Sequence, residues 1–312
     1  MGRVVAFGEC MVELSLSDVG TAEIGYAGDT FNTAVYLSRL GRRVACATAL
    51  GAGDRFSRAI LARMADEGID TDLVVEAEGR LPGLYAIERD PEGERSFLYW
   101  RGEAPVRDFF RLADLDRLAR ALREAELIYL SGISLAVVGE AGRARLLELV
   151  AEAARAGVPV AFDPNYRPRL WDSSPAARAA VEAMVGLCRF VSFAGADVEA
   201  LFAESGDVLG RAWASAGAEV VQRDADRSVH VHRAGATSDF PGQDAARVVD
   251  TTGAGDSFNA AYLATRLAGG PPERAVAAAQ ALAGLVVAWP GAIIPRSAHA
   301  AAAPLGERGG SR

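Results

Sequence analysis

The stretch that decides the fold is VVDTTGAGDSFNAAYLATRLAGG, residues 248–270, where two glycines flank an alanine and an aspartate follows at once. Small apolar residues then recur at helical spacing, which predicts a helix over 256–268. A helix N-terminus offers unpaired N–H groups and a positive dipole end, and preceding glycines let the backbone approach an anion closely. The stretch therefore indicates an anion site, although Asp256 would also serve as a plain N-cap.

Two familiar nucleotide motifs do not fit this stretch. The pattern GxGxxG lacks its third glycine because Phe258 stands there, and a phosphate loop needs a lysine. The chain has no lysine, so all 33 side chains with a permanent positive charge are arginines. A phosphate at this turn must be held by backbone N–H groups, by arginine or by a metal ion.

Elsewhere along the 312 residues, short β-branched runs alternate with longer helical patterns. This alternation predicts an α/β fold with a mostly parallel central sheet and helices on both faces. We expect the strands at 3–7, 43–50, 127–131, 159–163, 190–193 and 219–222. We expect the helices at 30–40, 55–67, 139–156, 175–187, 256–268 and 272–289.

Two β-rich insertions, at about 11–29 and 80–103, interrupt the pattern, and the second contains the turn sequence DPEG at 90–93. We expect them to form a small β-sheet lid over the carboxyl edge of the main sheet, where ligands bind in such folds. Residues 1–300 then make one domain, and 301–312 make a mobile tail.

Composition excludes several classes of protein. A net charge of -8 argues against nucleic-acid binding, and the apolar runs are too short to cross a membrane. The N-terminus lacks the features of a signal peptide. The three cysteines show neither disulfide nor metal-ligand spacing, which favours a reducing cytoplasm.

The segment DTTGAGDSF, 250–258, resembles the C-terminal signature of the ribokinase (PfkB) family of carbohydrate kinases. The resemblance implies a ribokinase-like fold, ATP as cosubstrate and Asp256 as the base that takes a proton from a sugar hydroxyl. It also implies that the N–H groups of Gly253, Ala254, Gly255 and Asp256 bind the transferred phosphoryl group. Donors at that place are physically apt, because the transition-state charge lies on the transferred oxygens.

A second stretch, GYAGDTFNTAVYLSRLG at 25–41, matches the sugar clamp of the same family. The resemblance implies that Gly28, Asp29 and Asn32 contact sugar hydroxyls, for which carboxylate and amide groups are suited. From composition alone, Asp29 or Thr30 would merely cap a helix, and Asn32 would be solvated.

The predicted hairpin carries an aromatic face. Alternation places Tyr85 and Ile87 on one face of its first strand, and Phe97, Tyr99 and Arg101 on one face of its second. Such a face suits a ligand, although an exposed lid with a solvated arginine has the same pattern.

The loop in FDPNYRPRLW, 162–171, follows a predicted strand, and its prolines hold it extended. Arg167 is expected to point into the cleft, unless the loop is purely structural. Together Arg101 and Arg167 indicate an acidic substrate, because arginine binds a carboxylate through two parallel hydrogen bonds.

Further stretches narrow the resemblance to family members that phosphorylate 2-keto-3-deoxygluconate (2-dehydro-3-deoxy-D-gluconate). They are GECMVELS, AGDTFNT, RLPGLYAIE, GERSFLYWR, YLSGISLA, FDPNYRPRLW and PGAIIPR. The resemblance implies transfer from ATP to the 6-hydroxyl with Mg²⁺, and substrate contacts by Tyr85, Tyr99, Arg101 and Arg167. It also implies a homo-oligomer formed through the lid, whose strand edges are free to pair. The alternatives are a kinase for another sugar or nucleoside, and a non-catalytic sugar-acid-binding protein.

Two segments depart from the family pattern. In VVQRDADRSVHV, 220–231, Gln222 stands for a usual lysine, and Asp224 and Arg227 stand for usual glycines. Arginine tolerates a positive φ poorly, so nucleotide binding is the function most affected. Arg223 or Arg227 is expected to supply the lost positive charge.

The other departure is SFAGADVEALF, 192–202, where the family usually has Asn or Ser followed by Glu three residues later. Here Ala194 and Asp197 occupy those positions. Asp197 would help place Mg²⁺ through water, or would only cap a helix.

Overall fold

The computed structural model describes residues 2–16, 20–89 and 95–302. The turn expected at 90–93 lies outside these ranges, as do residues 303–312 of the expected tail. Residues 301 and 302 belong to the last helix, α12 (Arg296–Ala302).

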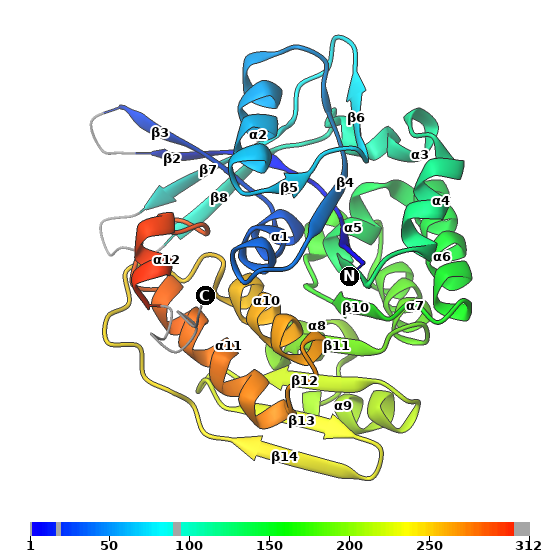
Figure 1. The fold of residues 1–312 in the computed structure, drawn as a ribbon, viewed down its shortest axis with the longest axis vertical. Helices are drawn as coiled ribbons and strands as arrows, with labels where there is room; N and C mark the ends of the chain where they lie inside the picture. The colour runs from blue at the N-terminus through cyan, green and yellow to red at the C-terminus, as the bar shows by residue number, and fades with distance from the viewer. Residues whose placement is uncertain (1, 17–19, 90–94, 303–312) are drawn as a thin grey trace, which may run out of the picture.

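The central sheet has ten strands in the order β14-β13-β12-β11-β10-β9-β1-β4-β5, and β6 also pairs with β4 (Figure 1). The strands from β12 to β5 are parallel, and β13 and β14 are antiparallel, so the predicted mostly parallel sheet is confirmed. The bounds are β1 (Val4–Phe7), β4 (Val44–Gly51), β5 (Ile69–Asp70), β6 (Val74–Ala77), β9 (Leu127–Ser131), β10 (Val160–Asp163), β11 (Phe190–Ala194), β12 (Glu219–Arg223), β13 (Val229–Arg233) and β14 (Ala236–Phe240).

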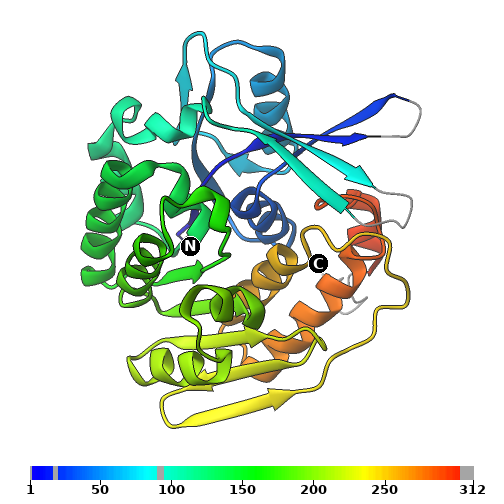
Figure 2. The same cartoon turned by 180° about the vertical axis from the view of Figure 1, so that it is seen from behind.

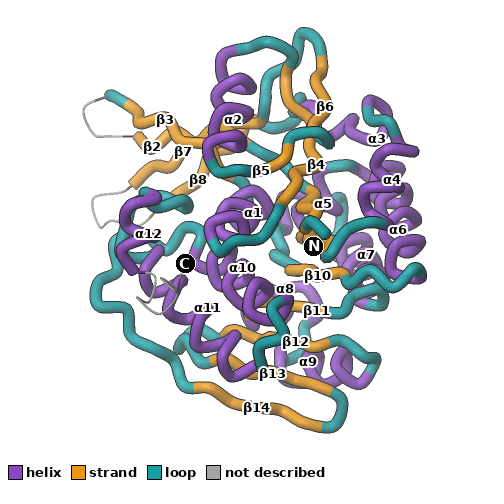
Figure 3. Tube along the Cα trace, in the orientation of Figure 1, coloured by secondary structure: helices purple, strands orange, loops and turns teal. Residues whose placement is uncertain are grey.

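Helices cover both faces of this sheet, as Figures 1 and 3 show. One face packs against α1 (Asp29–Arg39), α2 (Arg55–Asp66), α10 (Ala254–Leu267) and α11 (Pro272–Val286). The other packs against α4 (Leu115–Arg123), α5 (Gly132–Val137), α6 (Gly139–Arg155), α7 (Ser174–Val185), α8 (Gly195–Phe202) and α9 (Gly206–Ser215), with α3 (Phe109–Leu112) beside them. Side chains alternate along β1, so the strand contributes to both cores: Val4 packs with the helices of the first face and Val5 with those of the second.

The two insertions form a separate four-stranded sheet in the order β3-β2-β7-β8, as expected. Its strands are β2 (Met11–Leu16), β3 (Ala22–Ala27), β7 (Gly83–Arg89) and β8 (Arg95–Trp100). Figure 2 shows this small sheet projecting from the main body on the side where α12 lies.

Several predicted boundaries were wrong at helix ends. The helix expected at 256 begins at Ala254, because Gly253 takes a left-handed φ of 76° and becomes its N-cap. Gly253 also lies against the next segment, since an added Cβ would stand 2.7 Å from the carbonyl oxygen of Ala292. The helix expected to reach 289 ends at Val286. The sequence analysis also missed several shorter elements, among them α4, α9, β13 and β14, although the apolar residues of α4 and α9 recur at helical spacing.

No helix in the described ranges is long and apolar enough to cross a membrane. The three cysteines are free thiols; Cys10 and Cys46 are buried.

Arg227 lies in the turn between β12 and β13 with a φ of 72°, a left-handed conformation that glycine adopts most freely. Its N–H donates to the carbonyl oxygen of Asp224 at 2.9 Å, which closes the turn. The Arg227 side chain pairs with Asp244 at 2.7 Å, but both are well exposed, so this ion pair stabilises little. The backbone therefore keeps the glycine conformation, at the cost of strain.

Replacing Arg227 with glycine relieves this strain. We expect R227G to be more stable than R227A by about 1 kcal/mol, because both lack the ion pair and only glycine accepts the left-handed φ freely. Thermal melting should show a difference of about 2 °C. An R227A protein that melts at or above R227G would contradict the strain.

Candidate active site

The site forms where the N-termini of α1 and α10 meet. Asn32 donates through Nδ2 to Oδ2 of Asp256 at 2.8 Å, and the Thr33 hydroxyl donates to the Asp256 carbonyl at 3.3 Å. Asn32 is only 4% exposed, so the solvated alternative is wrong for this residue. The backbone at the start of α1 packs closely against Glu9, because an added Cβ at Gly28 would stand 2.1 Å from the Glu9 carbonyl oxygen.

Neither aspartate at these helix starts is an N-cap. The N-cap positions belong to Gly28 and Gly253, so Asp29 is the first residue of α1 and Asp256 the third of α10. Asp29 instead accepts a hydrogen bond from Asn165 Nδ2 at 2.9 Å. Both carboxylates are thus turned toward other elements and remain candidates for contact with a ligand.

Arg223 lies over the start of α10. An added Cβ at Gly255 would stand 2.5 Å from Arg223 Nη1, and the guanidinium carbon lies 5.6 Å from the Phe258 ring centre. Arg223 Nη2 donates to Oδ2 of Asp163 at 2.8 Å. Glycine at 255 is therefore what lets a guanidinium approach the helix N-terminus, where both would attract a phosphate.

The amides of this turn are not equivalent. The Ala254 N–H donates to the carbonyl oxygen of Thr251 at 3.3 Å, so part of its capacity is engaged within the turn. The first N–H groups of a helix have no acceptor inside the helix. Gly255 lies against Arg223, so the free N–H groups at the start of α10 and this guanidinium form a candidate anion site.

Gln222, which stands for the family lysine, points to the other face of β12. Its Nε2 donates to Asp224 at 2.9 Å, and its Oε1 lies 3.3 Å from Nε2 of His232. An added Cβ at Gly206 of α9 would stand 3.1 Å from the Gln222 amide. The loss of lysine at 222 therefore removes no charge from the start of α10, and Arg223 rather than Arg227 supplies a cation there.

The Asp256 carboxyl group has an unusual proton affinity. Loss of hydration through burial raises the pKa of Asp256 to about 8, and the negative charge of Asp29 adds to the rise. The hydrogen bond from Asn32 opposes it, Asp163 raises it further, and the Arg223 charge lowers it. A carboxylate with this pKa is a stronger base than an ordinary aspartate.

The small sheet contributes an aromatic face. Tyr85 pairs with Tyr99 across β7 and β8, their ring centres lie 5.8 Å apart, and Phe97 packs 6.2 Å from Tyr85. Tyr85 is buried and its hydroxyl donates to Glu13, whereas Tyr99 is 48% exposed. Burial and the Glu13 charge raise the pKa of Tyr85 far above its usual value, so this phenol stays protonated.

Arg101 follows this face and already holds a carboxylate. Its guanidinium lies 5.6 Å from the Tyr99 ring centre and pairs with Glu9, which is 3% exposed. Burial raises the pKa of Glu9, and the charge of Arg101 opposes that rise. The solvated-arginine alternative is therefore wrong, and a ligand carboxylate would share Arg101 with Glu9.

Arg167 is also paired. Its Nη1 lies 3.1 Å from both carboxylate oxygens of Asp197, and the side chain is about half exposed. Asp197 is the third residue of α8 and makes no capping bond, so the N-cap alternative is wrong. Burial raises the pKa of Asp197, and Arg167 lowers it.

Sequence reasoning missed four polar residues that join these parts. Asp163, Asn165 and Glu9 stand in stretches quoted for the resemblance, and Asn259 lies three residues after Asp256. Asp163 is the last residue of β10 and Asn165 lies two residues beyond it, and polar residues at the carboxyl end of a strand are a usable signal. Glu9 lies two residues after β1 and carries the same signal, but no local pattern pairs it with Arg101 of the hairpin.

The geometry can now be set beside known proteins. The profile of the pfkB family carbohydrate kinases matches residues 1–299. The chain is 41% identical over 306 residues to the 2-dehydro-3-deoxygluconokinase of Dickeya dadantii (strain 3937), covering 95% of this chain and 98% of that one. A crystal structure of a PfkB family carbohydrate kinase from Listeria grayi superposes with a TM-score of 0.81 at 26% identity, covering 96% and 99%.

A putative ribokinase II from Escherichia coli, solved in complex with ATP and Mg²⁺, has a TM-score of 0.78 at 21% identity, covering 94% and 95%. This likeness concerns the fold alone. The chain belongs to the PfkB family of carbohydrate kinases. It is a sugar kinase similar to 2-dehydro-3-deoxygluconokinase.

The raised pKa of Asp256 predicts a pH profile. Because a base acts only when ionised, kcat/KM should rise about tenfold per pH unit and level off above the folded-state pKa of about 8. Removing a neighbouring negative charge with D29N should move the inflection to lower pH, whatever the height of the profile. The exposed D207N variant, at a carboxylate that pairs with Arg211 on the surface, is the matched control. A flat profile from pH 6 to 9 would exclude a base with this pKa.

Proposed function

We propose that the protein transfers the γ-phosphoryl group of ATP to the 6-hydroxyl of 2-dehydro-3-deoxy-D-gluconate. The observation that carries the proposal is the meeting of Asp256, Arg223 and the N-terminus of α10 at one place. The 41% identity to a protein named 2-dehydro-3-deoxygluconokinase supports the choice of substrate.

In the proposed reaction, Asp256 accepts the proton of the 6-hydroxyl as its oxygen forms a bond to the γ-phosphorus. The bond between that phosphorus and the β–γ bridging oxygen breaks, and ADP leaves with the electron pair. The amides of Gly253, Gly255 and Asp256 and the Arg223 guanidinium stabilise the oxygens of the transferred group. Asp256 later releases the proton to solvent.

The sugar acid would lie between the small sheet and α1. Gly28, Asp29 and Asn32 would contact its hydroxyls, and the Tyr85 and Tyr99 face would cover it. Its carboxylate would interact with Arg101 and Arg167, joining Glu9 at the first and competing with Asp197 at the second. Arg167 suits this role because its half-exposed side chain can turn.

The described residues offer Mg²⁺ few protein ligands. No cluster of three acidic, histidine or cysteine ligands occurs in the described ranges, and Mg²⁺ in kinases is held mainly by phosphates and water. Asp197 would be the residue that holds it, through water. When bound, the ion neutralises phosphate charge.

We also infer that residues 1–300 form one kinase domain whose small sheet acts as a lid, and that the chain forms a homo-oligomer through it. Ile24, Leu98 and Trp100 are exposed on this sheet, which supports such pairing. The reaction would take place in the cytoplasm.

A kinase for a neutral sugar is the second candidate, because each expected substrate arginine already has a carboxylate partner in the chain. Turnover of 2-dehydro-3-deoxy-D-gluconate, its galactonate epimer, fructose and ribose should be compared directly. A clear preference for either neutral sugar would refute the sugar-acid proposal. Failure to bind ATP in calorimetry with Mg²⁺ would favour a non-catalytic binding protein instead.

The base role of Asp256 predicts opposite effects of D256N on activity and stability. Turnover should fall about 1000-fold or more, because the proton acceptor is lost while the shape is kept. A raised native pKa stabilises the protonated wild type at low pH, and this contribution is lost between about pH 4 and the folded-state pKa of about 8. The melting temperature of D256N should thus exceed that of the wild type by a margin that widens over this range. Retained turnover would remove Asp256 from the base role.

The proposed carboxylate contact of Arg167 is testable with R167Q. We expect KM for the sugar acid to rise roughly 10- to 100-fold, on the order of one charge-assisted hydrogen bond, with kcat less affected. The control is R211Q, which removes another exposed arginine from its pair with Asp207. Equal KM values in the two variants would rule the contact out.

A further inference from the structure

Asp163 joins three separate elements at the floor of the site. It is the last residue of β10 and is 6% exposed. Its Oδ2 accepts from Arg223 Nη2 and from Asn259 Nδ2, each at 2.8 Å, and its Oδ1 accepts from the Asn165 N–H at 3.0 Å. A buried carboxylate with this many partners is held in one geometry.

On the phosphate side, Asp163 connects Arg223 to the helix that Arg223 overlies. Asn259 stands one turn after Asp256 on α10, so the two side chains lie on the same helix face. Asp163 Oδ2 thus binds both the Arg223 guanidinium, which comes from β12, and the Asn259 amide, which comes from the first half of α10. Movement of either would break a hydrogen bond to Asp163.

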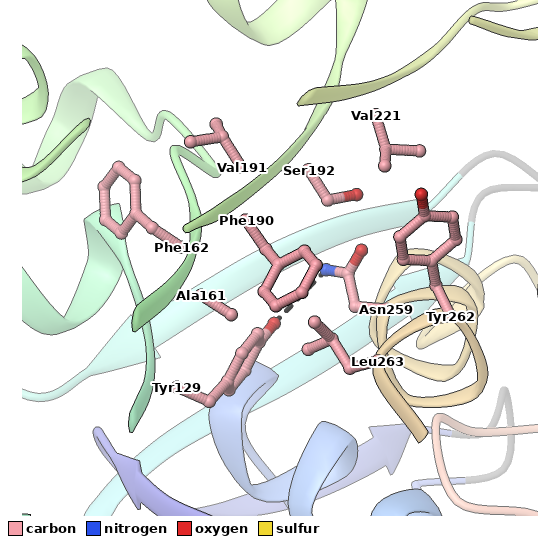
Figure 4. Close-up of a pocket in the computed structure, with 10 residues that line it drawn as sticks. All are labelled: Tyr129, Ala161, Phe162, Phe190, Val191, Ser192, Val221, Asn259, Tyr262 and Leu263. Carbon is pink, nitrogen blue, oxygen red and sulfur yellow. Dashed lines mark hydrogen bonds between the residues drawn. The ribbon is translucent and has the colours of Figure 1, made fainter. Parts of the chain in front are cut away.

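The orientation of Asn259 is itself restricted, as Figure 4 shows. Its Nδ2 also donates to the Tyr129 hydroxyl at 3.2 Å. Its Oδ1 has no hydrogen-bond partner in the described part of the chain, and neither has Ser192 Oγ; both residues line a cavity of about 10 Å³. Because the Asp163 carboxylate accepts a hydrogen bond from Nδ2, the Asn259 amide keeps its N–H group toward Asp163.

On the sugar side, Asp163 acts through Asn165. Asn165 has a φ of 34°, unusual for a residue other than glycine, and its N–H meets Asp163 Oδ1. Its Nδ2 holds Oδ2 of Asp29 at 2.9 Å. Asp163 is therefore one residue removed from a carboxylate proposed to contact the sugar.

We propose that Asp163 is a positioning residue that aligns the two halves of the site, Arg223 with α10 on the phosphate side and Asn165 with Asp29 on the sugar side. It touches neither reactant. This inference rests on the proposed phosphoryl transfer, because it explains how donor and acceptor are held in register.

The test is a double-mutant cycle on purified full-length protein, with D163N, R223Q and the combined variant. The substrate is whichever sugar the wild type phosphorylates best. D163N should lower kcat/KM about 100-fold, mainly through kcat. In a protein that already carries R223Q, adding D163N should lower kcat/KM much less, because part of the D163N effect acts through Arg223. E219Q is the control: Glu219 is an equally buried carboxylate, paired with Arg266 away from the site, and its loss should lower the melting temperature without this kcat effect.

A D163N protein within about threefold of wild type, or one equally impaired in both backgrounds, would overturn the inference. If D163N does not fold, N259L tests the same link, because it removes one brace and keeps the Asp163–Arg223 pair. N259L should lower kcat about tenfold, and wild-type kcat would count against the proposal.

If the wild type phosphorylates no sugar tested, the proposed function fails separately. ATP binding by calorimetry then decides: D163N should bind about tenfold more weakly, and equal affinity overturns the inference.

Discussion

The site depends on one costly placement, the burial of the Asp256 carboxylate at the point where α1 meets α10. Two further carboxylates, Asp29 and Asp163, raise its pKa, and Asn32 and Arg223 act in the opposite direction. Such an arrangement destabilises an isolated site and persists because the surrounding core holds it. The side chains of α10 from Phe258 to Ala264 are buried against the sheet and supply that support.

The same cost is useful for chemistry. An aspartate that accepts a proton near neutral pH is a better base for a sugar hydroxyl than one with an ordinary pKa. Arg223 and the helix N-terminus lie on one side of Asp256, and the α1 residues lie on the other. In the proposed reaction the base would thus have the phosphate-binding groups and the hydroxyl-binding groups both within reach, as phosphoryl transfer requires.

Much of this arrangement could be predicted from the sequence, and the reasons differ from part to part. The strand at 127–131 was predicted with its observed bounds, because a short buried run between polar segments has a clear pattern. That Gln222 and Arg223 point to opposite faces of β12 was predictable, since adjacent strand residues alternate, but which of them faces α10 was not. Two ion pairs of the site, Arg101 with Glu9 and Arg167 with Asp197, could not be predicted. Each joins residues far apart in the chain, and local sequence patterns do not report such contacts.

The unusual residues at 222–227 are accommodated without a change at the start of α10. Gln222 joins a polar group with Asp224 and His232, and Arg227 keeps a left-handed backbone despite its side chain. The start of α10 retains its glycines and gains its cation from Arg223. A chain without lysine can therefore keep a cation at the start of α10, as the proposed function needs.

Carbon-13 NMR of labelled aspartate carboxyl groups measures the proton affinity of Asp256 directly. The resonance that is present in the wild type and missing from D256N belongs to Asp256. The account predicts that this signal titrates with a midpoint near pH 8 in the ligand-free protein. A midpoint near pH 4, the ordinary range for aspartate, would contradict it.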